Sequence, residues 1–242
     1  CVPLRGRDGS VGVLTLERLG PEDRFTEEEY DLVKLFAAQV SIALQNAETH
    51  RVIAVRARTD ALTGLLNHGT FQDRLARTVD DGAPFSLVMI DLDDFKAVND
   101  ALGHQAGDRL LHEIATAIVT AGRDSDLVFR YGGDEFALIL PGTDRAGAML
   151  VAERVRALVE AVGAPATPWH EEGIEVSTSI GLATFPDDGP TSESILLAAD
   201  RACFVAKRSG EGLIATADEG RALAAEFSLQ EPTPVDPPSL PI

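Results

Sequence analysis

The sequence predicts an α+β fold: a ferredoxin-like palm, in which helices flank a central, mainly antiparallel sheet, preceded by a long linker helix. Three observations support this prediction. The chain has 242 residues and is 45% hydrophobic, enough for a substantial core and one or two domains. After residue 60, patterns typical of strands and helices alternate in the order βααββαβαβ. A strand–turn–strand pattern in the middle of that order requires antiparallel pairing, which distinguishes the fold from a doubly wound parallel sheet.

Charge and composition exclude several classes of partner. The net charge is −18, from 39 acidic and 21 basic residues. Such a surface repels nucleic acid and anionic membranes, so we expect neither as a partner. The sequence has no apolar run of about 18 residues that would predict a membrane span. Cys1 and Cys203 suggest no disulfide framework, which together with the lack of a secretory signal favours a cytoplasmic location.

The first 59 residues divide into a strand-rich segment and a helix. Residues 1–20 alternate strand and turn patterns, and Thr26 with Glu29 forms a helix capping box. Apolar residues then recur at helical spacing, and neither Gly nor Pro interrupts the chain before Gly64, which predicts a helix of roughly 30 residues. Its second half, 45–59, suits either a two-helix dimer seam or a solvated linker, and the pattern does not decide between them.

The remaining elements follow from hydrophobic periodicity. The run FSLVMIDL (85–92) is nearly all apolar, as a buried central strand would be. The tail has five prolines in its last eleven residues, so we expect 218–242 to be disordered. The other predicted elements are helices at 68–80, 94–101, 107–121, 144–163 and 192–208, a hairpin at 127–140, and strands at 174–185 and 212–217.

The stretch RYGGDEF (130–136) places two glycines directly before two acids, between two β-rich apolar runs. A Gly-Gly pair in that setting predicts a tight hairpin turn, because glycine adopts positive φ without steric cost. One interpretation is a surface hairpin with an acidic tip. The other is that the missing side chains let a ligand approach the backbone while Asp134 and Glu135 interact with a cation.

A second group of acids, in DLDDF (91–95), favours the cation. Asp91 ends the buried strand, and if the 127–140 hairpin is its neighbour, Asp134 lies close to it. Two converging carboxylates need a shared proton or a cation. Oxygen ligands at a backbone-rich turn suit Mg²⁺, the ion of phosphoryl-transfer sites. The alternative is an acidic loop with helix-capping aspartates.

Five motifs in order resemble the GGDEF family of diguanylate cyclases. They are TDALTGLLNH (59–68), DLDDFKAVNDALGHQAGDRLL (91–111), RYGGDEF (130–136), STSIGLATF (177–185) and ADRACFVAKRSG (199–210). The match covers about residues 58–216, roughly two-thirds of the chain. Upstream, a strand, an amphipathic helix and the ending AxxVSIALQNAE resemble the C-terminal part of a GAF sensory domain. The resulting division is a GAF-like fragment at 1–44, a linker helix at 45–59, the GGDEF domain at 60–217 and the tail at 218–242.

The resemblance implies that two GTP condense to cyclic di-GMP and two pyrophosphates across a homodimer. It implies that Asp91, the carbonyl of Leu92 and Asp134 hold Mg²⁺ or Mn²⁺, and that Glu135 assists at the metal or the attacking hydroxyl. The implied substrate-binding residues are Asn99, Asp108, Lys96, Gly132, Gly133 and Lys207. Asn99 and Asp108 match guanine-binding positions. A carboxylate can accept from guanine N1–H and N2–H₂, which adenine lacks. Read alone, both residues are more typical of helix caps.

A second site is implied by Arg123 and Asp126, which fit the RxxD pattern of the family's inhibitory product site. Arg154 matches an arginine that contributes to it. Guanidinium groups engage phosphate and guanine edges bidentately, and a carboxylate accepts from guanine donors.

The chain departs from the family pattern at several positions. His68 and Glu211 replace arginines, and Gly212 replaces asparagine. The resemblance implies that the replaced arginine contacts phosphate, so an acid at 211 predicts weaker GTP binding. Cys203 and Phe204 replace a Leu-Tyr pair, and we interpret both as core substitutions. Three hypotheses remain: an active cyclase, a weakly active receptor for GTP or cyclic di-GMP, and a structural dimerisation module.

Overall fold

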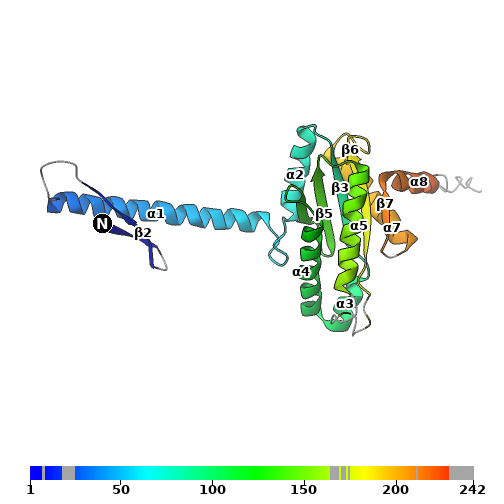
Figure 1. Ribbon diagram of the computed structural model, residues 1–242, viewed down its shortest axis with the longest axis horizontal. Helices are drawn as coiled ribbons and strands as arrows, with labels where there is room; N and C mark the ends of the chain where they lie inside the picture. The colour runs from blue at the N-terminus through cyan, green and yellow to red at the C-terminus, as the bar shows by residue number, and fades with distance from the viewer. Residues whose placement is uncertain are drawn as a thin grey trace, which may run out of the picture. The chain divides into compact units, whose positions relative to one another are not determined.

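A computed structural model describes residues 1–6, 9–17, 25–163, 169, 173, 175–210 and 212–228. The chain divides into two compact units, Cys1–Ala57 and Arg58–Ile242 (Figure 1). Glu211 and residues 229–242 lie outside the described residues, so the structure does not address the expectations for them.

The N-terminal unit pairs two strands with one long helix. β1 (Val2–Gly6) and β2 (Gly9–Leu14) are antiparallel, and α1 (Glu27–Arg58) has 32 residues. The predicted capping box is confirmed. The Thr26 backbone N–H donates to Glu29 Oε2 at 2.8 Å, and the Glu29 N–H donates to Thr26 Oγ1 at 3.2 Å.

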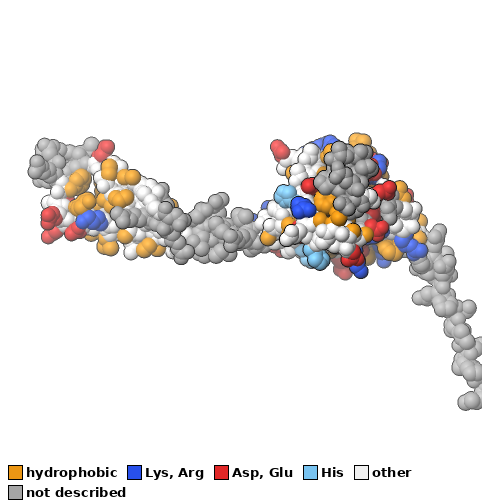
Figure 2. Space-filling model, turned by 90° about the horizontal axis from the view of Figure 1, so that it is seen from below, with side chains coloured by type: hydrophobic (Ala, Val, Ile, Leu, Met, Phe, Trp, Pro, Cys, Tyr) orange, Lys and Arg blue, Asp and Glu red, His pale blue; other side chains and the backbone are white. Residues whose placement is uncertain are grey.

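Apolar side chains remain exposed on this unit (Figure 2). Leu32 is 69% and Phe36 is 60% exposed. With Leu14 and Leu16 they line a hollow of about 410 Å³. Two strands are too few to cover this face of the helix. The hollow is almost entirely apolar, so it offers no charged group for catalysis.

The second unit is built on a five-stranded sheet of order β4-β5-β3-β6-β7. The central strand, β3, pairs antiparallel with β5 and with β6, and only the β6–β7 pair is parallel. The predicted α+β class with a mainly antiparallel sheet is therefore confirmed. The strands are β3 (Phe85–Leu92), β4 (Leu127–Arg130), β5 (Glu135–Pro141), β6 (Thr178–Phe185) and β7 (Ile214–Thr216).

Helices cover both faces of this sheet, which explains the unbroken apolar run of β3. Alternate residues of a strand point to opposite faces. Val88 and Ile90 join one buried cluster with α4 and α5, whereas Leu87 and Met89 join a second cluster with α2 and α7. The helices are α2 (His68–Asp80), α3 (Phe95–Leu102), α4 (His104–Ala121), α5 (Arg145–Val162), α7 (Ser192–Ser209) and α8 (Ala217–Ser228).

The expected disorder of the tail is wrong for residues 218–228, which belong to α8. Its start is capped, because the Thr216 backbone N–H donates to Glu219 Oε2 at 2.7 Å. Gly220 allows close packing on α7, since an added Cβ would lie 3.1 Å from the Ala202 backbone nitrogen. The composition of the following proline-rich segment does not reveal this packing.

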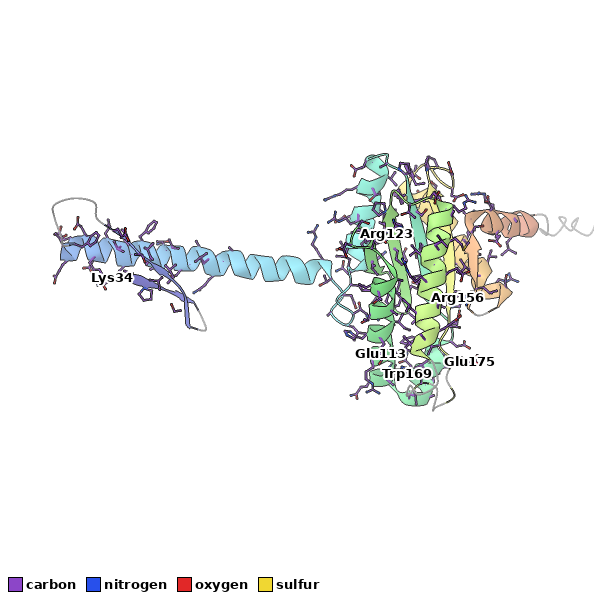
Figure 3. The ribbon with its side chains drawn as sticks, in the orientation of Figure 1. Lys34, Glu113, Arg123, Arg156, Trp169 and Glu175 are labelled. Carbon is purple, nitrogen blue, oxygen red and sulfur yellow. The ribbon has the colours of Figure 1, made fainter. Side chains whose placement is uncertain are left out.

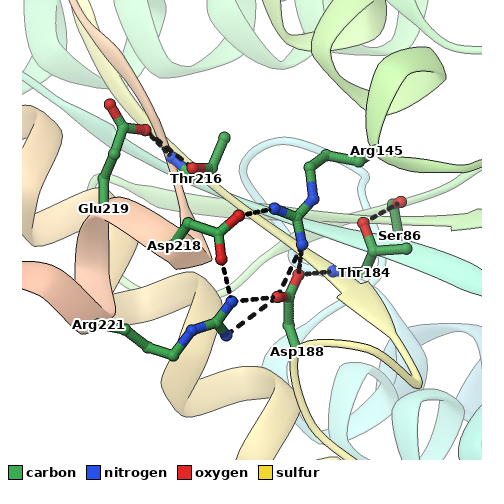
Figure 4. A network of polar contacts seen from close by, with 8 residues as sticks. All are labelled: Ser86, Arg145, Thr184, Asp188, Thr216, Asp218, Glu219 and Arg221. Atoms are coloured by element: carbon green, nitrogen blue, oxygen red, sulfur yellow. Dashed lines mark hydrogen bonds and ion pairs between the residues drawn. The ribbon is translucent and has the colours of Figure 1, made fainter.

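An ion-pair network around one buried carboxylate also holds α8 against the domain (Figure 4). The side chain of Asp188 is only 1% exposed and accepts hydrogen bonds from Arg145 of α5 and Arg221 of α8. It also accepts from the Thr184 backbone N–H at 2.7 Å. Asp218 of α8 pairs with the same two arginines. One buried carboxylate therefore joins β6, α5 and α8.

Within the residues that the structure describes, no helix is long and apolar enough to cross a membrane.

Candidate functional site

The acids predicted to converge meet where β3 and β5 lie side by side. Asp91 is the register partner of Glu135 on β5. One residue further, the Leu92 backbone N–H donates to the Asp134 carbonyl at 3.2 Å. Register partners in antiparallel strands point to the same face of the sheet. The fold therefore brings Asp91, Asp134 and Glu135 together, as the hairpin prediction requires.

Lys207 reaches the same point from α7, with its Nζ 2.5 Å from Asp91 Oδ1. A hollow of about 270 Å³ opens beside this pair. Its lining includes Asp91, Glu135, Asp200, Arg201, Phe204 and Lys207.

The electrostatics of this cluster leave an excess of negative charge. Burial raises the pKa of Asp91; Lys207 opposes that shift, while Asp134 and Asp93 reinforce it. Burial also raises the pKa of Glu135, and the charges of Asp91 and Asp134 add to the rise. Burial alone would lower the pKa of Lys207, but its contact with Asp91 outweighs burial and the pKa is raised. One lysine therefore faces several carboxylates, and a further cation would relieve their repulsion.

The donor set suits a hard divalent cation that keeps part of its water shell. Among the described residues, no three or more His, Cys, Asp or Glu side chains form a group that could hold a metal ion. The set predicted from sequence has fewer side chains: Asp91, Asp134 and the carbonyl of Leu92. All three are oxygen donors, and Mg²⁺ uses few protein ligands when phosphate oxygens and water complete its shell. The residues present therefore fit Mg²⁺ or Mn²⁺ bound together with a nucleotide.

The two glycines form the predicted hairpin turn, but the expectation that they adopt positive φ is wrong. Neither Gly132 nor Gly133 has positive φ. The backbone N–H groups of Tyr131 and Gly132 both donate to the Glu135 carbonyl, at 2.8 and 3.1 Å. An added Cβ at Gly132 would come within 2.3 Å of Glu135 Oε2, whereas one at Gly133 would meet nothing within 4 Å. Gly133 therefore faces open space beside the acids.

An arginine clamp that the sequence did not reveal holds this turn. Arg130 Nη2 donates to the Gly133 carbonyl at 2.8 Å, and its Nη1 donates to Asp60 Oδ1 at 3.0 Å. Asp60 in turn accepts from the Thr63 backbone N–H and hydroxyl, at 2.9 and 2.8 Å. Burial would raise the pKa of Asp60, but these bonds from Thr63 and Arg130 outweigh burial and the pKa is lowered. Both residues lie inside quoted motifs, but 70 positions separate them, so no local pattern pairs them.

Asn99 and Asp108 lie on α3 and α4, the two helices that follow β3. Neither residue is a helix cap, as their positions read alone had suggested, because the N-cap residues of these helices are Asp94 and Gly103. Asn99 is half-buried and Asp108 is exposed. The Asn99 side chain lies against Gly107, where an added Cβ would be 2.1 Å from Asn99 Oδ1. The side chains of Asn99 and Asp108 therefore lie on the two helices that follow the end of β3.

Lys96 is exposed on α3, just after the acids of β3. It therefore lies in the same region as the other predicted nucleotide-binding residues, with its ammonium group accessible to an anion.

Two of the three predicted inhibitory residues, Arg123 and Asp126, follow the C-terminal end of α4; Figure 3 shows Arg123 there. Arg123 and Asp126 form one turn, in which the Arg123 backbone N–H donates to Asp126 Oδ2 at 2.7 Å. The Arg123 side chain is exposed. Arg154 is exposed on α5, and the described contacts include none that joins it to this turn. From Asp108 to Arg123 the rise of α4 is about 20 Å, so the two predicted sites are separate.

The departures from the family pattern have distinct structural outcomes. Cys203 is buried, its thiol donates to the Ser179 carbonyl at 3.3 Å, and burial raises its pKa to about 12, which agrees with a core role. Phe204 is 54% exposed, so its core assignment is wrong: it lines the hollow beside Asp91 and Lys207. Gly212 has φ +70°, a conformation that Gly and Asn adopt readily. His68 packs edge-on against Tyr131, with ring centroids 4.7 Å apart.

Comparison with known proteins gives matches to two domain families. The model of the diguanylate cyclase GGDEF domain matches residues 57–212, and a GAF domain model matches residues 1–46. The chain is 33% identical to diguanylate cyclase A of Treponema denticola over 221 residues, covering 88% of this chain and 58% of that protein. It is 34% identical to diguanylate cyclase TpbB of Pseudomonas aeruginosa over 235 residues, covering 94% of this chain and 51% of that one.

Among solved structures, the coiled coil and GGDEF domain of DgcB from Caulobacter crescentus, in complex with c-di-GMP, has a TM-score of 0.70 and 27% identity. That match covers 77% of this chain and 99% of DgcB's. The chain spans about half the length of the two curated relatives.

Proposed function

Because the chain belongs to the GGDEF family of diguanylate cyclases, we propose that it condenses two GTP molecules to cyclic di-GMP and two pyrophosphates. The observation that carries this proposal is the meeting of Asp91, Asp134 and Glu135 beside the open backbone at Gly133. A structural hairpin would not need so many carboxylates at one strand end, because their repulsion opposes folding.

In each of the two condensations, a ribose 3′-oxygen forms a bond to the α-phosphorus of the other GTP. The bond from that phosphorus to the bridging oxygen of pyrophosphate breaks, and the hydroxyl proton must be accepted. Glu135 fits that role, because it lines the same hollow as Asp91.

Asp91, the Leu92 carbonyl and Asp134 would hold Mg²⁺ or Mn²⁺. When bound, the ion would supply charge stabilisation at the α-phosphate and acidify the attacking hydroxyl. Lys207, which contacts Asp91, would also contact the phosphates, together with the exposed Lys96. At Gly132 and Gly133, the absence of side chains would let the nucleotide approach the backbone.

Guanine specificity would come from Asn99 and Asp108. The Asp108 carboxylate accepts from guanine N1–H and N2–H₂ together. Adenine has an acceptor at N1 and no amino group at C2, so it would leave the carboxylate unpaired, at a cost of about 1–3 kcal/mol.

One chain would bind one GTP, so we propose that the reaction takes place between two protomers. We propose the cytoplasm as its location. The GAF-like residues 1–44 and the linker helix 45–59 would bring them together. Product would inhibit by binding at Arg123, Asp126 and Arg154, whose exposed arginines can pair with phosphate. The alternative is a receptor with weak or no turnover, which the acid at Glu211 favours.

The first test is turnover by protein stripped of bound nucleotide. GTP and Mg²⁺ are added, and the products are separated by chromatography and identified by mass. Cyclic di-GMP with pyrophosphate supports the cyclase; unchanged GTP with a dimeric protein that binds nucleotide supports the receptor. Asp134→Ala should abolish turnover without unfolding, whereas Asp73→Ala, which removes an exposed acid of α2, should not.

A second test addresses product inhibition. Arg123→Ala should shift the cyclic di-GMP inhibition curve to higher concentration, whereas Asp124→Ala, in the same exposed turn, serves as the matched control. Coincident curves for Arg123→Ala and the wild type would remove the inhibitory site from the proposal.

A further inference from the structure

We propose that Asp93 is a positioning residue, whose buried carboxylate sets the places of Asp91 and of the end of α7 that carries Lys207. The catalytic consequence rests on the proposed function, but the structural role does not. Asp93 was one of three aspartates in DLDDF, and the sequence did not distinguish its task from theirs.

Asp93 is 7% exposed, and its carboxylate is held by three donors. The hydroxyl of Ser179 donates to Oδ1 at 2.7 Å. The hydroxyl of Ser177 and the backbone N–H of Gly212 donate to Oδ2, at 2.7 and 3.0 Å. An ionised carboxylate has about four acceptor sites, so most of its capacity is used inside the protein. Asp93 is therefore a structural acceptor, in contrast to Asp91, which lines the open hollow.

These donors come from two segments far apart in the sequence. Ser177 and Ser179 lie at the start of β6, next to the last pairs of the β3–β6 ladder. Gly212 lies in the turn between α7 and β7. Since Lys207 lies in the last turn of α7, one carboxylate fixes the strand end with Asp91 relative to the helix end with Lys207.

The backbone beside Asp93 also needs support. The next residue, Asp94, is the one non-glycine with positive φ in the described chain, at φ 50°. Such a conformation persists in a non-glycine residue when surrounding contacts hold it. The Asp93 backbone N–H donates to the Ser177 carbonyl at 3.2 Å, and the Thr178 hydroxyl donates to the Asp91 carbonyl at 2.9 Å. Together they hold the chain where β3 turns into α3.

A carboxylate at this position has an electrostatic disadvantage that its geometry must offset. Its three donors are neutral, so its charge adds to the repulsion around Asp91. The useful property of Asp93 is therefore its arrangement of acceptors. Asparagine has the same shape, keeps one oxygen for Ser177 and Gly212, and turns its amide toward the Ser179 hydroxyl, which can accept instead. Asp93→Asn should preserve the arrangement, whereas Asp93→Ala leaves all three donors unpaired.

Hydrogen exchange measured by mass spectrometry tests the structural role independently of any activity. In Asp93→Ala, exchange should rise at the start of β6 and at the end of α7, while the core strand β5 stays protected. Asp93→Asn and the control Asp100→Asn, on the exposed side of α3, should match the wild type. Unchanged exchange in Asp93→Ala would overturn the proposal. So would equal loss of protection throughout the domain, since that indicates general unfolding.

Kinetics test the catalytic consequence. Per folded protein, Asp93→Ala should lower kcat for GTP by about 100-fold with KM changed less than about threefold, because Asn99 and Asp108 remain in place. Asp93→Asn should recover kcat to within about fivefold of the wild type. If kcat falls as far in Asp93→Asn as in Asp93→Ala, the proposal that Asp93 acts through the geometry of its acceptors is refuted. If the wild type makes no product, the proposed function fails, and the exchange experiment still decides the role of Asp93.

Discussion

Two glycine-to-alanine substitutions should distinguish a glycine that is needed for helix packing from one that is needed for the approach of the substrate. Gly181 of β6 faces α7 so closely that an added Cβ would lie 2.2 Å from both the Ala199 carbonyl oxygen and the Cys203 nitrogen. Positions 199 and 203 are i and i+4 of the helix, the carbonyl and amide that an α-helix pairs. Both atoms belong to the backbone, so no side-chain rotation can relieve the clash.

The cost of Gly181→Ala follows from this geometry. To restore ordinary contact near 3.4 Å, α7 would have to retreat by about 1 Å, although it shares a buried cluster with β6. Overpacking typically costs 1–3 kcal/mol, and a backbone clash belongs at the upper end, about 3 kcal/mol. For a domain of this size, that lowers Tm by about 6–12 °C. The shift also moves Lys207 away from Asp91, so turnover should fall as well.

Gly133→Ala is the matched substitution. Its added methyl group meets nothing within 4 Å and its φ is not positive, so stability should stay unchanged or rise by about 0.5 kcal/mol. Turnover should nevertheless fall, by about 10- to 100-fold, because the methyl group occupies the proposed path of the nucleotide. Thermal unfolding followed by circular dichroism, with GTP turnover on the same preparations, measures both effects. A Tm for Gly181→Ala within 2 °C of the wild type would refute the packing argument, and full turnover by Gly133→Ala would refute the approach argument.

Three further predictions concern named side chains. Asp60→Asn should lower the free energy of unfolding by about 1–2 kcal/mol at pH 7. Because folding lowers the pKa of Asp60, that difference should persist above pH ~4 and disappear as pH falls through the lowered value in urea titrations. Iodoacetamide should label Cys1 and spare Cys203, whose pKa is about 12, until the protein unfolds; rapid labelling of both in mass spectra would contradict its burial. Asp188→Ala should cost about 2–3 kcal/mol and Arg221→Ala about 1 kcal/mol, because only the aspartate is fully buried; equal urea midpoints would contradict this ranking.

Local sequence patterns were sufficient to predict the strands and helices and to identify the acids of the site. The continuous apolar run of β3 predicts its bounds at 85–92, because a strand covered on both faces has no polar side. On the condition that the hairpin after 127 is the neighbouring pair, the acid at the end of this strand is predicted to lie near Asp134, and the pairing of β3 with β5 meets that condition. These predictions succeed because hydrophobic periodicity and turn composition act over a few residues.

The predictions that failed depend on contacts between distant segments. The turn at Gly132 and Gly133, which has positive φ at neither glycine, is held by Arg130, whose partner Asp60 lies far away in the sequence. Residues 218–228 form α8 because Asp188 and α7 give that helix a surface to pack on.

The sequence by itself determined the family, the α+β class and the carboxylates available for chemistry. Only the tertiary structure decided how the three aspartates of DLDDF differ. Asp91 lines the hollow, Asp93 is buried under three donors, and Asp94 takes the strained turn. The physical reason is that the role of a carboxylate depends on its burial and its hydrogen-bond donors, and here those donors come from β6 and the turn after α7.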